Sequence, residues 1–286
     1  MTLGIDRGEL MHPVEVELLC AYAEVAAPFP LEIPSSGETE VERLVLFRGA
    51  RELMSERGLA DENGPLGVAD DFVYLLNHAT GVLDLVLATE RPALAVAVLT
   101  YRNEALLVSQ NLAEPERMVR MKACTLDDSI EDLVRLVPKL DAPVSAPFNL
   151  PRAAVQSAFE LMLQRLPARV AWAESSDGDD TAEVRVPNPL GAEELDELLR
   201  AQGIDERMVR RMVTNLQPVL GSGQAGVAKR DGTEDQWRRC GDELRWLDSA
   251  RGRFRLAEDG EWLSVNPFTT DELRAGLRRL ATQIRG

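Results

Sequence analysis

The sequence predicts an α+β protein in which a central, mostly antiparallel β-sheet carries helical bundles, with two related halves in a quasi-twofold arrangement. Three observations support this class. Helical periodicity gives way to short apolar runs twice along the 286-residue chain. Two segments 144 residues apart share the same helix-start pattern. The composition, 45% hydrophobic and 28% charged, is that of a globular protein with one large domain or two ordinary ones.

The first half is expected to run from helices into an antiparallel meander and then into a closing helix. Apolar residues at three- and four-residue spacing indicate the helices, and short apolar runs bounded by turns indicate the strands. The helices cover Val41 to Glu56 and Asp70 to Asn77; the strands cover Ala93 to Tyr101, Ala105 to Gln110 and Met118 to Cys124; the closing helix follows from Thr125.

The second half is expected to repeat this order. Its helices cover Ala153 to Leu166, Glu193 to Gln202 and Glu206 to Leu220, its strands Leu244 to Asp248, Arg253 to Ala257 and Glu261 to Val265, and a closing helix follows from Thr269. Asp205 is a candidate cap for the third helix, and Pro218 with Gly221 is expected to end it.

The two closing helices carry the clearest internal correspondence. Thr125 to Leu136 and Thr269 to Leu280 each open with a threonine suited to an N-cap, place acids in the first turn and continue as an apolar stripe. We therefore divide the chain into residues 1–142 and 143–286, joined by the Pro-rich stretch Pro138 to Pro151, and expect one compact unit that shares a sheet. Coincidence is the alternative, because such helix starts are common.

Glycines at 221, 223 and 226 spell G-x-G-x-x-G, the pattern of dinucleotide-binding loops. That function requires a strand before the glycines and a helix after them, so that the helix N-terminus faces the phosphate. Here helical periodicity precedes the glycines, and an Asp-Gly turn at 231–232 follows a strand-like run. The order favours glycines that end a helix and begin a strand.

Charge, cysteine content and chain start limit the function classes. A net charge of −16 argues against nucleic acid and anionic membranes, and no apolar run is long enough for a membrane helix. Residues 1–143 hold a net charge of −13 and the remainder −3, which indicates either a solvated acidic surface or a partner surface in the second half. The three dispersed cysteines predict no disulfide scaffold or metal site, and the first eleven residues lack a signal-peptide pattern. We expect a cytoplasmic protein without a cofactor.

No catalytic constellation can be assembled from the sequence. The only histidines, His12 and His78, have no Cys, Asp or Glu at metal-ligand spacing, and no Walker, H-E-x-x-H or G-x-S-x-G motif occurs. We therefore predict that the protein is not an enzyme.

An ordered set of motifs in the second half resembles the EspG family of actinobacterial type VII (ESX) secretion-associated proteins. It comprises Gly221-Ser222-Gly223-Gln224-Ala225-Gly226, Trp246-Leu247-Asp248-Ser249-Ala250-Arg251-Gly252-Arg253-Phe254, Asp259-Gly260-Glu261-Trp262 and the helix from Asp271 to Leu277. Glu261 and Ala225 depart from the family pattern, and the first half offers almost no motif support. The resemblance implies a quasi-twofold sheet with helical bundles.

The resemblance also implies a function: a cytosolic chaperone that binds the helical tip of the PPE subunit in a PE–PPE heterodimer. A nucleotide-dependent enzyme using Gly221 to Gly226 and a generic interaction module are the alternatives, and the oligomeric state is left open. Methionines suit a surface that adapts to related partners, although the apolar helix residues would equally suit a core. The candidate contact residues are Met208, Met212, Asn215, Leu216, Gln224, Val227 and Lys229, with Arg102 and Asn103 at a hairpin tip.

Overall fold

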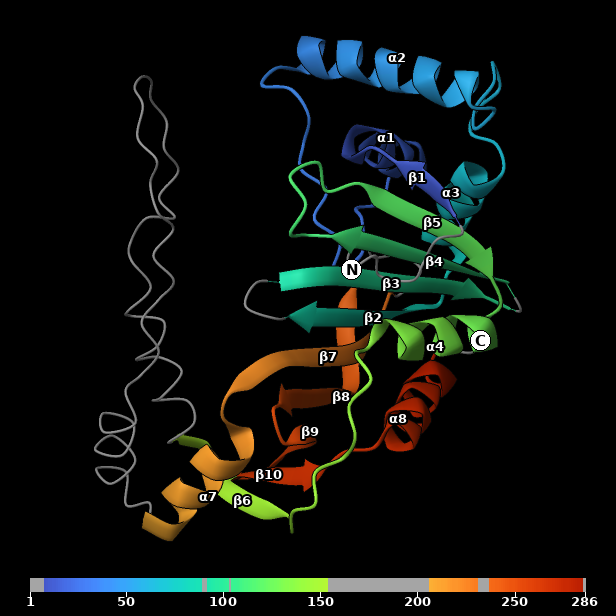
Figure 1. Cartoon of the computed structure of the whole chain (residues 1–286). Coiled ribbons are helices and arrows are strands. Elements are labelled where there is room, and N and C mark those ends of the chain that lie inside the picture. Colours follow the sequence, from blue (N-terminus) through green and yellow to red (C-terminus); the bar gives the residue numbers. More distant parts are fainter. Residues whose placement is uncertain (1–7, 89–91, 103, 154–205, 231–236, 285–286) are drawn as a thin grey trace, which may run out of the picture.

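The computed structural model describes residues 8–88, 92–102, 104–153, 206–230 and 237–284. Its strands form one ten-stranded sheet in the order β1-β5-β4-β3-β2-β7-β8-β9-β10-β6 (Figure 1). Every neighbouring pair in this sheet is antiparallel. The predicted α+β class with a central antiparallel sheet is therefore confirmed.

The elements alternate along the chain as groups of helices and strands. The strands are β1 (Glu9–Met11), β2 (Gly81–Ala88), β3 (Pro92–Tyr101), β4 (Glu104–Asn111), β5 (Val119–Cys124), β6 (Phe148–Pro151), β7 (Val219–Lys229), β8 (Arg238–Ser249), β9 (Gly252–Asp259) and β10 (Trp262–Pro267). The described helices are α1 (Pro13–Ala23), α2 (Glu40–Glu56), α3 (Val68–His78), α4 (Leu126–Leu136), α7 (Glu206–Leu216) and α8 (Thr270–Thr282). None of these helices is long and apolar enough to cross a membrane.

Strands β2 and β7 meet at the middle of the sheet, with Gly81 opposite Lys229 and Ala88 opposite Ser222. Outward from this junction, β3, β4 and β5 follow on one side, and β8, β9 and β10 follow on the other, each in chain order. Each half thus contributes one meander, and β1 and β6 close the two edges. This order gives the predicted quasi-twofold arrangement.

Helices α4 and α8 follow the two meanders and begin in the same way. The Thr125 hydroxyl accepts a hydrogen bond from the Asp128 amide at 3.2 Å, and the Thr269 hydroxyl accepts one from the Glu272 amide at 3.1 Å. Both threonines are N-caps, as the correspondence 144 residues apart predicts. The two helices lie together beside the sheet (Figure 1), and Arg274 of α8 pairs with Glu131 of α4 at 3.1 Å.

Both faces of the sheet carry apolar cores. On one face, α4 and α8 cover a cluster that spans both halves, including Leu85, Val96, Val227 and Trp246. On the other face, α1 and α3 cover alternate residues of the first meander, such as Leu99 and Val108. The period-two alternation of β3 and β4 supplies both cores, so the apolar runs Leu94 to Leu99 and Ala105 to Val108 are buried on both faces of the sheet.

The glycines of the G-x-G-x-x-G pattern lie inside β7. The predicted order of helix and then strand is confirmed, but α7 ends at Leu216 and β7 begins at Val219, so the glycines do not separate the two. A Cβ at Gly223 would lie 1.9 Å from the Trp246 ring, and one at Gly226 would lie 2.6 Å from the Arg239 guanidinium. These glycines let large side chains of β8 pack against β7, and the described residues that follow them continue the strand to Lys229 and do not begin a helix.

Helix α1 and strands β1, β2 and β6 are absent from the sequence prediction. His12 caps α1: its Nδ1 accepts from the Val14 amide at 3.3 Å, and the Glu15 carboxylate accepts from the His12 amide at 2.8 Å. A capping box with Pro13 at the first helical position is readable in the sequence and was missed. Apart from Ala153, the predicted helices at 153–166 and 193–202 lie outside the described residues.

The Asp248 to Arg253 motif is a structural clamp at the β8–β9 turn. Arg253 is buried and donates two hydrogen bonds to the Asp248 carboxylate at 2.7 and 2.9 Å, and a third to the Pro138 carbonyl at 2.7 Å. Gly252 has a φ of 128°, and a Cβ there would lie 2.3 Å from the Asp141 carbonyl oxygen. The motif therefore ties the turn to the chain that connects the halves.

Candidate functional site

One face of the sheet has a region that no described helix covers. On this face α1 and α3 pack over the first meander, and α7 packs over β6, β9 and β10. Between them lie half-buried or exposed side chains of β2, β7 and β8, which pair across the strands. We call this region the central strip; it consists of Val86, Gln224, Arg239, Glu243 and Arg245.

Side chains of alternating charge form ion pairs that connect the central strip to its surroundings. Arg239 pairs with Asp84 of β2 and, through Nε at 2.7 Å, with Glu243. Arg245 donates to Glu243 at 2.7 Å and to Glu258 of β9 at 3.1 Å. The Gln224 amide donates to Glu243 at 3.4 Å. These contacts hold the polar side chains in place across four strands, β2, β7, β8 and β9.

Asp84 is the buried end of this network. Burial raises the pKa of its carboxyl to about 6, against the opposing effect of the Arg239 hydrogen bond and charge. One carboxylate oxygen, Oδ1, is buried without a hydrogen-bond partner. At Glu243 burial also acts to raise the pKa, but the hydrogen bonds from Arg239 and Arg245 prevail and lower it. One end of the network is therefore the buried, poorly solvated carboxylate of Asp84. From there the network continues along the sheet face through Arg239, Glu243 and Arg245.

The three predicted apolar residues of α7 lie together. Met208, Met212 and Leu216 are half-buried and pack against a core cluster on β6, β9 and β10 that consists of Phe148, Leu150, Phe254 and Val265. These side chains therefore contribute to packing and also retain exposed surface, and their contact with a partner stays a prediction. They border the central strip at the end of the sheet where β7 begins.

The other predicted residues of this segment lie in different environments. The Asn215 amide donates to the Arg211 carbonyl within α7 at 2.7 Å. Gln224 occupies the middle of the central strip, opposite Val86 on one side and Arg245 on the other. Val227 is fully buried beneath α4 and α8, so its side chain has no surface to offer a partner. The sequence could not separate these cases because neighbouring strand residues alternate between faces.

The remaining predicted residues lie at the far end of the sheet from α7. Lys229 is exposed and pairs with Gly81, at the end of the sheet where the β3–β4 hairpin turns. Arg102 is exposed at this turn with a φ of 56°, and its guanidinium lies 5.1 Å from the Tyr101 ring centroid. Asn103 lies outside the described residues. The predicted set therefore comprises an α7 group, a central Gln224 and a separate pair at the opposite end.

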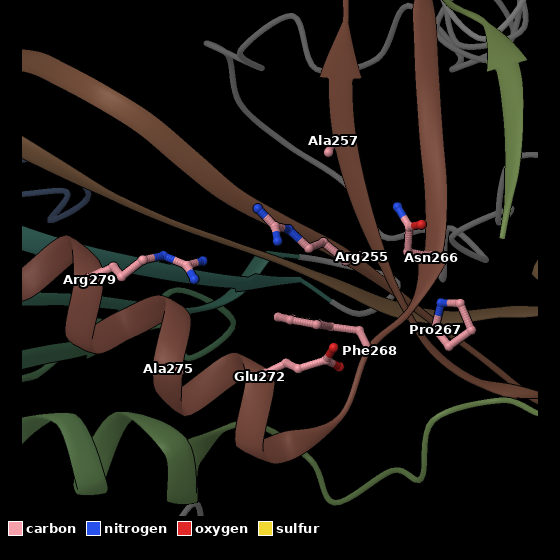
Figure 2. Close-up of a pocket in the computed structure, with 8 residues that line it drawn as sticks. All are labelled: Arg255, Ala257, Asn266, Pro267, Phe268, Glu272, Ala275 and Arg279. Atoms are coloured by element: carbon pink, nitrogen blue, oxygen red, sulfur yellow. The ribbon is translucent and has the colours of Figure 1, made fainter.

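A groove of about 470 Å³ lies on the other face, between α8 and the ends of β9 and β10. Figure 2 shows Arg279 of α8 and Arg255 of β9 directed into the space between helix and strands, with Phe268 below. Glu272 also lines this groove, but its carboxylate is engaged by the Thr269 cap. Within the described ranges, no three His, Cys, Asp or Glu side chains gather as a metal site.

Sequence reasoning missed Asp84 and the arginines of β8. Asp84 stands in the apolar run from Gly81 to Ala88, where a lone acid inside a buried strand signals a paired or functional charge. That signal was available, but its partner Arg239 lies 155 residues away and becomes apparent only when β2, β7 and β8 are aligned.

The fold and the strip define a two-half α+β protein with an extended sheet face that is bordered by helices and that no described helix covers. The model of the EspG family matches residues 12–279, and the chain belongs to this family. Among solved structures it is similar to the Mycobacterium tuberculosis type VII secretion system chaperone EspG5 in complex with a PE25–PPE41 dimer. That similarity has a TM-score of 0.62 at 11% identity, covers 97% of each chain, and supports the fold. The search of curated proteins found no match.

Proposed function

We propose that this protein is a cytosolic chaperone that binds a PE–PPE-type dimer for type VII secretion and masks the helical tip of the PPE subunit. The observation that carries the proposal is the EspG family model, which matches the chain from residue 12 to residue 279. The fold shared with EspG5, which was solved with a PE25–PPE41 dimer, supports it.

We place the contact surface on the central strip and its borders. Apolar side chains surround the polar strip: Leu220 at the start of β7 is 50% exposed, and Phe29 is 55% exposed with its ring centroid 5.4 Å from the Arg239 guanidinium. An apolar helical tip would self-associate if it were left exposed. The apolar border of this surface can cover the apolar residues of the tip, while the charged side chains of the central strip fix the orientation of the tip.

Within this surface we assign different roles to the sequence candidates. Met208, Met212 and Leu216 form an adaptable apolar border, because methionine side chains repack at low cost. Gln224 and Asn215 provide amide groups, and the exposed Lys229 and Arg102 extend the surface to the far end of the sheet. Val227 is left out because it is buried. Residue-by-residue substitution would test each of these assignments.

Co-expression tests the function. The chain would be produced with a PE–PPE pair encoded near its gene, and the pair would also be produced alone. We expect the pair to be soluble and to co-elute with the chain in one size-exclusion peak only in the co-expression. A pair that is equally soluble alone and never co-elutes would contradict the proposal.

A further inference from the structure

Helix α2 presents an apolar outer surface that none of the other described helices and strands covers. Its inner residues Ala50 and Met54 are buried towards α1, and the helix forms the outermost layer of this end of the molecule (Figure 1). A surface helix usually carries polar side chains on its outward face. Here five large apolar residues are between 42% and 71% exposed, namely Val41, Leu44, Val45, Leu46 and Leu53. Such a patch marks an interaction surface.

Gly49 is a second, independent feature of this helix. It lies in the helix interior, where glycine is the least favourable residue after proline. A Cβ built at Gly49 would meet no atom within 4 Å, so no described neighbour requires a glycine. Val45 and Leu53 lie one turn to either side of it on the same ridge. A small residue between two large apolar ones forms a notch in which another helix can approach closely.

We propose that α2 pairs with α2 of a second copy of this chain, antiparallel and crossing at Gly49. The ridge is self-complementary in this orientation, because a twofold axis at Gly49 places ridge residues that are equally far from Gly49 at the same level of the helix pair. Val45 then lies opposite Leu53 of the second copy, and Leu53 lies opposite Val45. Leu46 lies on one flank of the crossing, beside Leu53 of the second copy.

Charges on the other flank agree with this orientation. Neither Arg48 nor Glu52 forms an ion pair with any described residue. The crossing brings Arg48 beside Glu52 of the second copy, and symmetry makes the pair twice. Helix α2 itself contains four glutamates and three arginines, so two copies can approach with little repulsion although residues 1–143 carry a net charge of −13.

The size of this interface limits its strength. One helix pair buries less than the roughly 1,600 Å² of a standard protein interface. We therefore expect a reversible dimer with a micromolar or weaker dissociation constant, which forms as protein concentration rises. The inference does not depend on the proposed function, since it concerns the chain alone.

Sedimentation equilibrium of the full chain at up to about 300 µM tests the dimer. Gly49→Leu is the informative variant, because it fills the notch and also improves the helix. We expect it to weaken dimerisation at least tenfold while the melting temperature of the monomer rises or stays unchanged. A wild-type chain that remains monomeric throughout, or a variant that dimerises as well as the wild type, would overturn the proposal.

Crosslinking tests the crossing point. Gly49→Cys places a thiol next to the axis, where oxidation should join two chains, whereas Glu40→Cys at the start of the same helix lies far from its symmetry mate. Burial raises the pKa of native Cys20 to about 12 and of Cys124 to about 11, so these two remain thiols, and the unmutated chain measures any background crosslinking. Equal crosslinking of the two variants would contradict an antiparallel pair centred on Gly49.

Discussion

At the scale of residues, the pair of Asp84 and Arg239 is asymmetric. Asp84 is 1% exposed, whereas the Arg239 side chain is 30% exposed and lies over the Phe29 ring. Water can hydrate Arg239 if its partner is lost, but it cannot reach Asp84. Removal of Arg239 and removal of Asp84 should therefore have opposite consequences for stability.

Arg239→Ala should lower the free energy of unfolding by about 3 kcal/mol, because it leaves a buried carboxylate without its counter-charge. Denaturant unfolding at pH 7 provides the measurement. Arg238→Ala, a neighbouring arginine on the same strand that is exposed, is the control and should change stability by less than about 1 kcal/mol. Equal losses in the two variants would show that the contact with Asp84 contributes little.

Asp84→Asn should be stabilising near neutral pH. Because the folded pKa of Asp84 is raised to about 6, the folded protein binds its proton more tightly than the unfolded chain does. Asp84 therefore favours folding below about pH 4, and this contribution is lost as pH rises through about 6. The variant should equal the wild type at pH 4 and exceed it by about 2 kcal/mol at pH 7. A difference that does not change with pH would contradict the raised pKa.

At the scale of elements, the glycines of β7 serve close packing against β8. Gly223→Ala should lower stability by at least about 2 kcal/mol, because the new Cβ would overlap the buried Trp246 ring. Gly49→Ala is the matched control: it adds the same methyl group in open space on a helix and should raise monomer stability by about 1 kcal/mol. Thermal melts of both variants at low protein concentration give the comparison, and a neutral Gly223→Ala would contradict the packing argument.

Elements with a strong local signal were predictable from the sequence. Helix α2 and the closing helices were predicted closely because periodicity and threonine caps lie within a few residues. Strand β2 was missed, although its apolar run is as clear as that of β3, and α1 was missed despite its capping box.

Other features depend on how strands align. The burial of Val227, the position of Gln224 on the open face and the Asp84–Arg239 pair follow from the β2–β7–β8 register. No local pattern encodes the β2–β7 part of this register, because it joins residues more than a hundred positions apart, such as Val86 and Gln224. The candidate site was therefore predicted only in part: its α7 border and Gln224 were named, and its charged residues were not.

At the scale of the whole molecule, the junction of β2 and β7 makes each half depend on the other. We predict that residues 1–142 or 143–286, produced alone, will aggregate or lack a cooperative thermal transition, because an inner strand edge and its apolar face would be exposed. Co-expression of the two halves should restore a soluble complex that melts cooperatively, as followed by circular dichroism. A single half that is monomeric and melts cooperatively by itself would instead indicate two independent domains.

The central claim is that the uncovered strip binds a PE–PPE dimer, and the affinity of two arginine variants tests it most directly. Gln224→Arg adds a long, charged side chain to the middle of the central strip, and Ala275→Arg adds the same side chain to exposed α8 on the opposite face. Calorimetry with a purified PE–PPE dimer would follow thermal melts that verify folding. We predict that Gln224→Arg weakens binding at least tenfold and that Ala275→Arg binds as the wild type does. Unchanged binding by Gln224→Arg, or an equal loss in both variants, would contradict the claim.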